Sequence, residues 1–239
     1  MRKKYEWTCR VIMERLYYKY GYFVTLTYDD LHLPSNKGVS YAHADYFLDR
    51  LRDCFKTCNL GFSYYLMSEY GGRSQRPHLH MHLLTDMPQL QVSVMISHLW
   101  KHGFIKIGCS TLKSILYTSA FHLLPKEHKN AYPVPNFHII SRGLGKNYAD
   151  EHADFNFSNN RKVFEFGGFK FNLPPYVSKR MGFMSEKKLQ DLDLNEVYRN
   201  FMASCDEKGF DFKESMRQWY QYCNNFYDKM IKQGLKNKI

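Results

Sequence analysis

Three histidines, His78, His80 and His82, alternate with apolar residues in the segment PHLHMHLL. Successive side chains of a β-strand point to opposite faces, so a strand here would line one face with three imidazoles. An apolar core does not favour such a row, because each buried ring nitrogen needs a hydrogen-bond partner. Two imidazoles two residues apart can instead bind a divalent cation from one side, leaving positions for a carboxylate, water and a phosphate. The spacing therefore predicts a metal site.

Glu69 is the expected third ligand of this site. It lies in SEYGG, at the end of the run FSYYLMSE that precedes the histidine segment. If the two runs form neighbouring antiparallel strands, the carboxylate comes beside the imidazole pair. Imidazoles with a carboxylate suit Mn, Mg or Zn with little discrimination, and we expect Mg or Mn for a phosphodiester substrate.

The hydrophobic pattern predicts the elements that position these residues. Runs of β-branched and aromatic residues with a period of two indicate strands, and apolar residues at helical spacing indicate amphipathic helices. The predicted order is strand 22–28, helix 41–58, strands 62–69 and 78–84, helix 89–101, strand 103–108 and a helix from the Ser110 or Thr111 cap to 124. This order predicts an α+β fold with an antiparallel, ferredoxin- or RRM-like sheet that helices cover on one face.

The second half of the chain has a less regular pattern. Residues 125–182 are rich in proline and aromatic residues, and we expect irregular structure there apart from a hairpin through Gly167 and Gly168. Beyond them the pattern becomes helical. We therefore predict two domains, a catalytic domain over residues 1–182 and a helical C-terminal extension over residues 183–239.

Composition and charge restrict the class of protein. The 239 residues include 34 Lys or Arg and 23 Asp or Glu, a formal net charge of +11, and 44% are hydrophobic, which excludes a disordered basic tail. Such a surplus on a folded body favours a polyanionic partner, because neutralised phosphates release counterions. The six cysteines show neither metal-binding nor secreted spacing, and no apolar run approaches the ~18 residues needed to cross a bilayer. We expect a soluble, cytoplasmic protein that binds nucleic acid.

The segment His78-Leu79-His80, with Glu69 upstream, resembles the histidine–hydrophobe–histidine motif of the HUH endonuclease superfamily. The runs FVTLTYDDLHLP, SEYGGRSQRPHLH and HIISRGLGKNY are similar, in this order, to stretches of the replication initiators of microviruses, single-stranded DNA phages of the gokushovirus type. The similarity spans about residues 22–182. It implies a rolling-circle replication initiator that nicks and rejoins single-stranded DNA at an origin in the bacterial host cytoplasm. A host polymerase and helicase are then further expected partners.

The resemblance also implies a tyrosine nucleophile on a helix that faces the metal, and STLKSILYTSAFHLL supplies Tyr117. A phenol with a pKa near ~10 is a poor nucleophile, so metal polarisation of the phosphate must supply much of the catalysis. Some family members carry a second tyrosine four residues later, where this chain has Phe121. A single nucleophile is therefore expected, and termination needs Tyr117 of another copy or a different acceptor. The oligomeric state stays open.

Basic residues around these segments are candidates for contacts with DNA. Lys113 lies one helical turn before Tyr117 and Lys126 lies beyond the helix, and either could stabilise the phosphotyrosine charge. His82 is a further candidate neighbour of the site. Arginines interleaved with Phe and Tyr suit a groove that follows the phosphates of a single strand and stacks its bases. We expect DNA contacts from Arg73, Arg76, Arg142, Arg161 and Lys162.

Two other classes of function fit part of the pattern. The run HLHMHLL also matches the histidine triad of nucleotide hydrolases and transferases, in which His80 would be the nucleophile without a metal. A chelator separates this reading, because it abolishes HUH-type nicking and spares triad chemistry. The second alternative is a non-enzymatic module that binds single-stranded nucleic acid on an RRM-like sheet, with aromatic residues rather than histidines on the open face. A relaxase or plasmid initiator of the HUH superfamily would differ in substrate alone.

Overall fold

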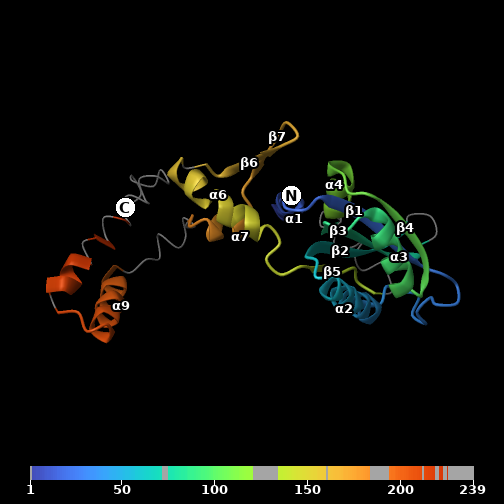
Figure 1. Ribbon diagram of the computed structural model, residues 1–239, viewed down its shortest axis with the longest axis horizontal. Coiled ribbons are helices and arrows are strands. Elements are labelled where there is room, and N and C mark those ends of the chain that lie inside the picture. The colour runs from blue at the N-terminus through green and yellow to red at the C-terminus, as the bar shows by residue number, and fades with distance from the viewer. Residues whose placement is uncertain are drawn as a thin grey trace. The chain divides into compact units, whose positions relative to one another are not determined.

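The computed structural model describes residues 2–71, 75–120, 134–159, 161–183, 194–211, 213–218, 221–222 and 225 (Figure 1). Contacts within the chain group it into two units. Unit 1 comprises Met1–Tyr148 with Phe164–Pro174, and unit 2 comprises Ala149–Val163 with Pro175–Ile239. The units interleave along the sequence, and the predicted domains 1–182 and 183–239 stay a prediction.

A five-stranded antiparallel sheet forms the centre of unit 1, with the strand order β4-β1-β3-β2-β5. The strands are β1 (Tyr20–Tyr28), β2 (Phe62–Tyr70), β3 (Pro77–Thr85), β4 (Gly103–Cys109) and β5 (His138–Ile140). Each described pairing is antiparallel. The predicted α+β class and the first four strands are confirmed, and β5 is an additional strand that the sequence pattern did not predict.

One face of the sheet forms the main apolar core under α2 (Tyr41–Thr57) and α3 (Gln89–Leu99). β3 contributes Leu79, Met81 and Leu83 to this core, and all three are buried. Full burial of each such side chain stabilises the fold by ~1.5–3 kcal/mol. The alternation of β3 therefore fixes one of its faces to the core and leaves its histidines on the other.

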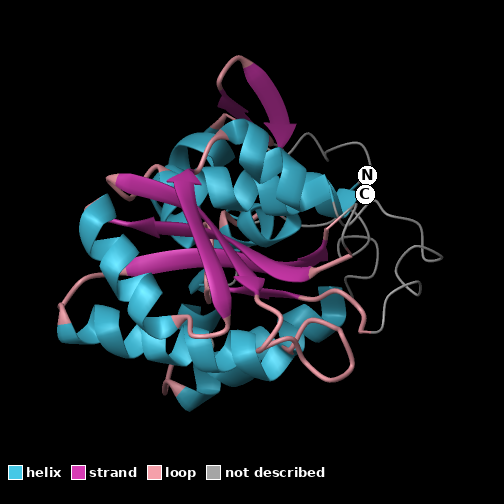
Figure 2. Ribbon diagram, turned by 90° about the vertical axis from the view of Figure 1, so that its right-hand side faces the viewer, coloured by secondary structure: helices cyan, strands magenta, loops and turns pink. Residues whose placement is uncertain are grey.

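Helices also lie over the second face, which differs from the expected one-sided arrangement. α1 (Arg2–Arg15) packs there with Trp7 against Tyr65 of β2, at 5.9 Å between ring centroids. α4 (Leu112–Ala120) lies over the same face, where it contacts the ring of His82. Figure 1 shows α2 and α4 on opposite sides of the sheet, and Figure 2 shows the strands between helices on both sides. The sheet of unit 1 is thus a middle layer.

The region predicted to be irregular holds two further helices and the expected hairpin. The hairpin is β6 (Val163–Phe166) and β7 (Phe169–Asn172), joined by Gly167 and Gly168 at positive φ. The helices are α6 (Lys146–Ser158) and α7 (Pro175–Arg180), and in unit 2 α9 (Leu194–Glu207) confirms the expected helical pattern. No helix in the described part of the chain is both long and apolar enough to span a membrane.

Candidate metal centre and nucleophile

The register of the central strands brings Glu69, His78 and His80 together on the second face of the sheet. Glu69 of β2 pairs directly with His78 of β3, and His80 lies two residues further along the same face. The Nε2 atoms of the two histidines are 3.1 Å apart. Oε2 of Glu69 lies 3.1 Å from Nε2 of His80 and 3.8 Å from Nε2 of His78. These three side chains form a group that could hold a metal ion.

The separations between the donor atoms fit one divalent cation. Two ligands ~2.1 Å from a common ion lie ~3.0–3.4 Å apart at octahedral or tetrahedral angles. Oε2 of Glu69 is buried and accepts no hydrogen bond of good geometry from the described residues, although His80 lies close to it. A buried carboxylate oxygen left in this way needs a partner, and a cation between the three donors would supply one.

Partners on the outer side of both imidazoles orient their Nε2 atoms toward this group. Nδ1 of His78 donates to the backbone oxygen of Arg76 at 3.1 Å, so that proton sits on Nδ1 and the lone pair of Nε2 is free. Nδ1 of His80 lies 3.0 Å from Oγ1 of Thr25, its neighbour on β1. Such contacts fix the tautomer of a metal-binding histidine. Sequence reasoning missed Thr25, although its alternation with apolar residues in FVTLTY places it on the polar face.

α4 presents Tyr117 to the carboxylate of Glu69. The phenolic hydroxyl donates to Oε1 of Glu69 at 2.7 Å, and the Tyr117 ring lies 5.9 Å from the ring of His80. The side chain is nevertheless 54% exposed, so a substrate can approach it. Burial of the hydroxyl and its hydrogen bond to Glu69 raise the pKa of Tyr117 to about 12. The phenol is therefore protonated at neutral pH and does not ionise on its own.

The electrostatics of the group favour the protonation states that bind a cation. Burial tends to raise the pKa of Glu69, but hydrogen bonds from His80 and Tyr117 outweigh it and the pKa is lowered. Burial and the neighbouring His80 lower the pKa of His78. At neutral pH the carboxylate is thus ionised and the His78 imidazole is neutral. Metal ligands need these forms, because a proton and a cation compete for the same lone pair.

His82 lies below α4 and outside the metal-binding group among the described residues. Its Nδ1 is 2.7 Å from the hydroxyl of Ser110, and its Nε2 is 3.0 Å from the hydroxyl of Thr118. Thr118 also donates to the backbone oxygen of Ile115, so its oxygen accepts from Nε2–H of His82. The neutral ring therefore links β3 to both ends of α4. His82 positions the helix that carries Tyr117.

Acid should destabilise the protein through His82. Burial and the nearby His80 lower its pKa to about 3, so the folded state stays unprotonated where the unfolded state binds a proton. Stability is full above the unfolded pKa of ~6.5 and falls by ~1.4 kcal/mol per pH unit below it, until the folded pKa is reached. Urea unfolding with a chelator should show ~1.4 kcal/mol less of this contribution at pH 5.5 than at pH 7.5.

The variant His82→Gln should lose that part of the pH dependence, together with stability at neutral pH. The control His98→Gln changes an exposed histidine of α3 and should keep the wild-type pH dependence. An unchanged pH dependence in His82→Gln would contradict the role of the buried ring.

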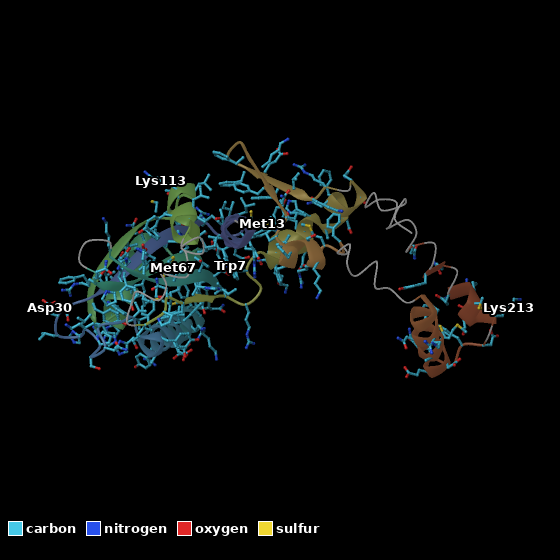
Figure 3. The ribbon with its side chains drawn as sticks, turned by 180° about the vertical axis from the view of Figure 1, so that it is seen from behind. Trp7, Met13, Asp30, Met67, Lys113 and Lys213 are labelled. Carbon is cyan, nitrogen blue, oxygen red and sulfur yellow. The ribbon has the colours of Figure 1, made fainter. Side chains whose placement is uncertain are left out.

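Other residues predicted beside the site are placed differently. Lys113 is exposed on α4, and in Figure 3 it lies at the end of the helix away from Met67 of the sheet. Arg76 donates to the backbone oxygen of Tyr28 at 2.9 Å and pairs with the carboxylate of Asp30, so part of its role is to fix the end of β1. The predicted contacts of Arg73 and Lys126 lie outside the described residues.

The structure does not bring the remaining predicted DNA contacts to the metal-binding group. Arg142 is exposed in the turn after β5, next to Ser141, whose amide donates to the backbone oxygen of Tyr64. Tyr64 is five residues from Glu69 along β2, or ~17 Å. Arg161 and Lys162 belong to unit 2, where Nζ of Lys162 lies 5.5 Å from the ring centroid of Phe183. Contacts of these residues with DNA stay predictions.

Comparisons with known proteins point to replication. The family model of the replication-associated protein ORF2 matches residues 21–122, which run from β1 past Tyr117. The replication-associated protein ORF2 of Spiroplasma virus 4 is 30% identical over 227 residues, covering 85% of this chain and 68% of the relative. The replication-associated protein VP4 of Bdellovibrio phage phiMH2K is 28% identical over 210 residues, covering 73% of this chain and 65% of the relative. This chain thus spans about two thirds of the length of either relative.

A solved structure of low similarity also matches. The hypothetical protein ORF119 from Sulfolobus islandicus rod-shaped virus 1 is 17% identical, with a TM-score of 0.35. The match covers 48% of this chain and 93% of the viral protein. This similarity is too low to support an argument about function.

Proposed function

The chain belongs to the ORF2 family of replication-associated proteins, and we propose that it is a rolling-circle replication initiator of the HUH type. In this proposal it nicks single-stranded DNA at a phage origin and rejoins the strand after synthesis. The observation that supports it best is the hydroxyl of Tyr117, which lies 2.7 Å from Glu69 in the group Glu69, His78 and His80.

In the proposed reaction, Glu69, His78 and His80 hold a divalent cation, Mg or Mn. When bound, this cation polarises the scissile phosphate and stabilises the charge that develops on it. The oxygen of Tyr117 forms a bond to phosphorus, the bond from phosphorus to the 3′ oxygen breaks, and the departing strand gains a free 3′ hydroxyl. The phenolic proton leaves along the hydrogen bond to Oε1 of Glu69, the acceptor already in place. The 5′ end stays on Tyr117 as a phosphodiester.

The phosphotyrosine bond permits the reverse reaction. Attack by a 3′ hydroxyl on the same phosphorus releases Tyr117 and restores the DNA bond, without an external energy source. His82 keeps α4 in register with the sheet in both directions, and Thr25 keeps Nε2 of His80 directed at the cation. A single tyrosine at this position means that termination uses Tyr117 of a second copy or another acceptor. The freed 3′ hydroxyl in turn offers a primer to a host polymerase.

A direct test is to incubate the full chain with circular phage-type single strands and Mn²⁺, and then to identify the DNA-linked peptide by mass spectrometry. The expected peptide contains Tyr117, and a chelator should prevent its formation. The same circle in duplex form is the control and should give little linked peptide. Linkage at another residue, or linkage that a chelator does not reduce, would overturn the proposal. A chelator-resistant linkage at His80 would instead support histidine-triad chemistry.

A further inference from the structure

β4 is an edge strand of the described sheet, and its side chains divide between two faces. Ile105 and Ile107 pack against the apolar core. Phe104 and Lys106 point to the opposite face and are exposed, Phe104 by 68%. Lys106 forms no ion pair with any residue that the structure describes, and Phe104 stacks on no described ring. A large aromatic side chain and a free cation thus stand side by side in solvent.

The strand register places these two residues in line with the candidate metal ligands. Phe104 of β4 pairs with Thr27 of β1, and Thr27 pairs with His78 of β3. In the next row of the sheet, Lys106 pairs with Thr25 and Thr25 pairs with His80. Each row spans two strand spacings, or ~10 Å. Phe104 and Lys106 therefore lie on the same face as the metal-binding group, at the margin of the sheet.

The surface between the metal-binding group and β4 is low. Thr25 and Thr27 separate the two, and both have small, half-buried side chains. Further along β4, Gly108 has open space where a side chain would stand. The bulkier pair Phe23 and His82 lies at the end of the face that α4 covers. A chain molecule bound at the metal-binding group can thus extend over the threonines to β4 without crossing a large side chain.

We propose that Phe104 and Lys106 form a docking site for one nucleotide of single-stranded DNA, in which a base stacks on Phe104 and a phosphate pairs with Lys106. The site rests on the proposed function, because it binds the strand that the metal-binding group would cleave. Alternating aromatic and basic side chains suit single strands, since every base has a face that can stack and every nucleotide carries a phosphate. The net charge of +11 is complementary to such a polyanion.

Two ordinary explanations for these residues make different predictions. A lysine on an edge strand can prevent pairing with another sheet edge, and a single exposed hydrophobic side chain is common on protein surfaces. In the first case Lys106→Ala would promote aggregation and leave DNA affinity unchanged. In the second case Phe104→Ala would change nothing. A contact with a second copy of the chain would instead change the oligomeric state.

The test measures how the full chain binds a fluorescein-labelled oligo-dT strand by anisotropy, with a chelator present and over a series of salt concentrations. Loss of one stacked base should weaken binding by roughly tenfold in Phe104→Ala at each salt concentration. Phe104→Trp should restore most of the affinity because it keeps a stacking face. Lys106→Ala should also make the slope of log affinity against log salt shallower by about 0.7, the value for one lost phosphate contact on a single strand.

Matched controls lie on α2, which covers the opposite face of the sheet. Tyr46→Ala removes an aromatic side chain that is 64% exposed, and Lys56→Ala removes an exposed lysine. Neither should change the affinity by more than about twofold, whereas equal losses in controls and test variants would overturn the docking site. So would wild-type binding by Phe104→Ala and Lys106→Ala, a change confined to oligomeric state in sedimentation, or no binding of the strand by the wild-type chain.

Formation of the Tyr117 adduct, measured in parallel, separates this proposal from the proposed function. If the wild-type chain forms the adduct and the two β4 variants bind DNA normally, the docking site is wrong and the initiator stands. If no adduct forms but the β4 variants lose affinity as described, the initiator is wrong and the docking site stands.

Discussion

Replacement of Tyr117 by phenylalanine should abolish the covalent link between the protein and nicked DNA, with a loss of about 10³-fold or more. The substitution deletes the oxygen that forms the bond to phosphorus and keeps the ring. It removes one hydrogen bond, to Oε1 of Glu69, from a half-exposed side chain, so the cost in stability should not exceed ~1 kcal/mol. A strand labelled at its 3′ end, resolved on a denaturing gel, reports the protein-linked product.

The control for this variant is Tyr46→Phe, the same change at an exposed tyrosine of α2. It should form the adduct at the wild-type rate. Both variants should bind an oligo-dT strand as the wild-type chain does, which shows that the loss concerns chemistry rather than binding. Protein-linked DNA at a wild-type level in Tyr117→Phe would show that another residue attacks the phosphate.

Substitution of His78 by alanine should weaken Mn²⁺ binding by more than ~100-fold and reduce adduct formation with it. Loss of a hydrogen bond behind a ligand already costs ~10–100-fold in metal affinity, and this change removes a donor atom itself. Calorimetric titration of the protein with Mn²⁺ in the absence of DNA measures the first effect. Excess Mn²⁺ should raise the melting temperature of the wild-type chain, because an ion that binds the folded state stabilises it by mass action, and should do so far less in His78→Ala.

His98→Ala provides the comparison, since His98 is exposed on α3 on the opposite side of the sheet. It should bind Mn²⁺ and form the adduct as the wild-type chain does. Should His78→Ala retain the wild-type affinity for Mn²⁺, the group Glu69, His78 and His80 would not be the metal site. Recovery of adduct formation at high Mn²⁺ would instead agree with a weakened site.

The central part of the fold was predictable because its pattern is local. β3 alternates histidine with Leu79, Met81 and Leu83, and a period of two with one apolar set has few other solutions than a strand on a core. The neighbourhood of Glu69 and His78 followed from one further assumption, antiparallel pairing of adjacent runs. The structure contains that pairing.

Elements that depend on long-range contacts were not predictable in the same way. In α1, residues 8–14 are all buried, including Arg10 and Glu14, so the helix shows no polar stripe. These two side chains instead bond to the backbone of Leu144 and Gly145, over 130 residues away. β5 has three residues, too few to display a period. Its pairing with β2 places Arg142 far from Glu69, which no local pattern indicates.

The separate role of His82 was hidden for a similar reason. The sequence presents three equivalent imidazoles on one face. The structure differentiates them by what lies above each position along β3, with Glu69 near the first two and Ser110 and Thr118 around the third. The identity of these partners depends on where α4 docks, and docking is a property of the whole unit.

The position of β3 between two hydrogen-bonded neighbours limits how this protein can evolve. One inserted or deleted residue would exchange the contents of its two faces and send imidazoles into the hydrocarbon interior, so length changes in this segment are strongly selected against. β4, with a neighbour on one side and open water on the other, carries no such penalty. Viral lineages can therefore drift toward new target sequences at the margin of the sheet while the cleavage chemistry at its centre is inherited unaltered.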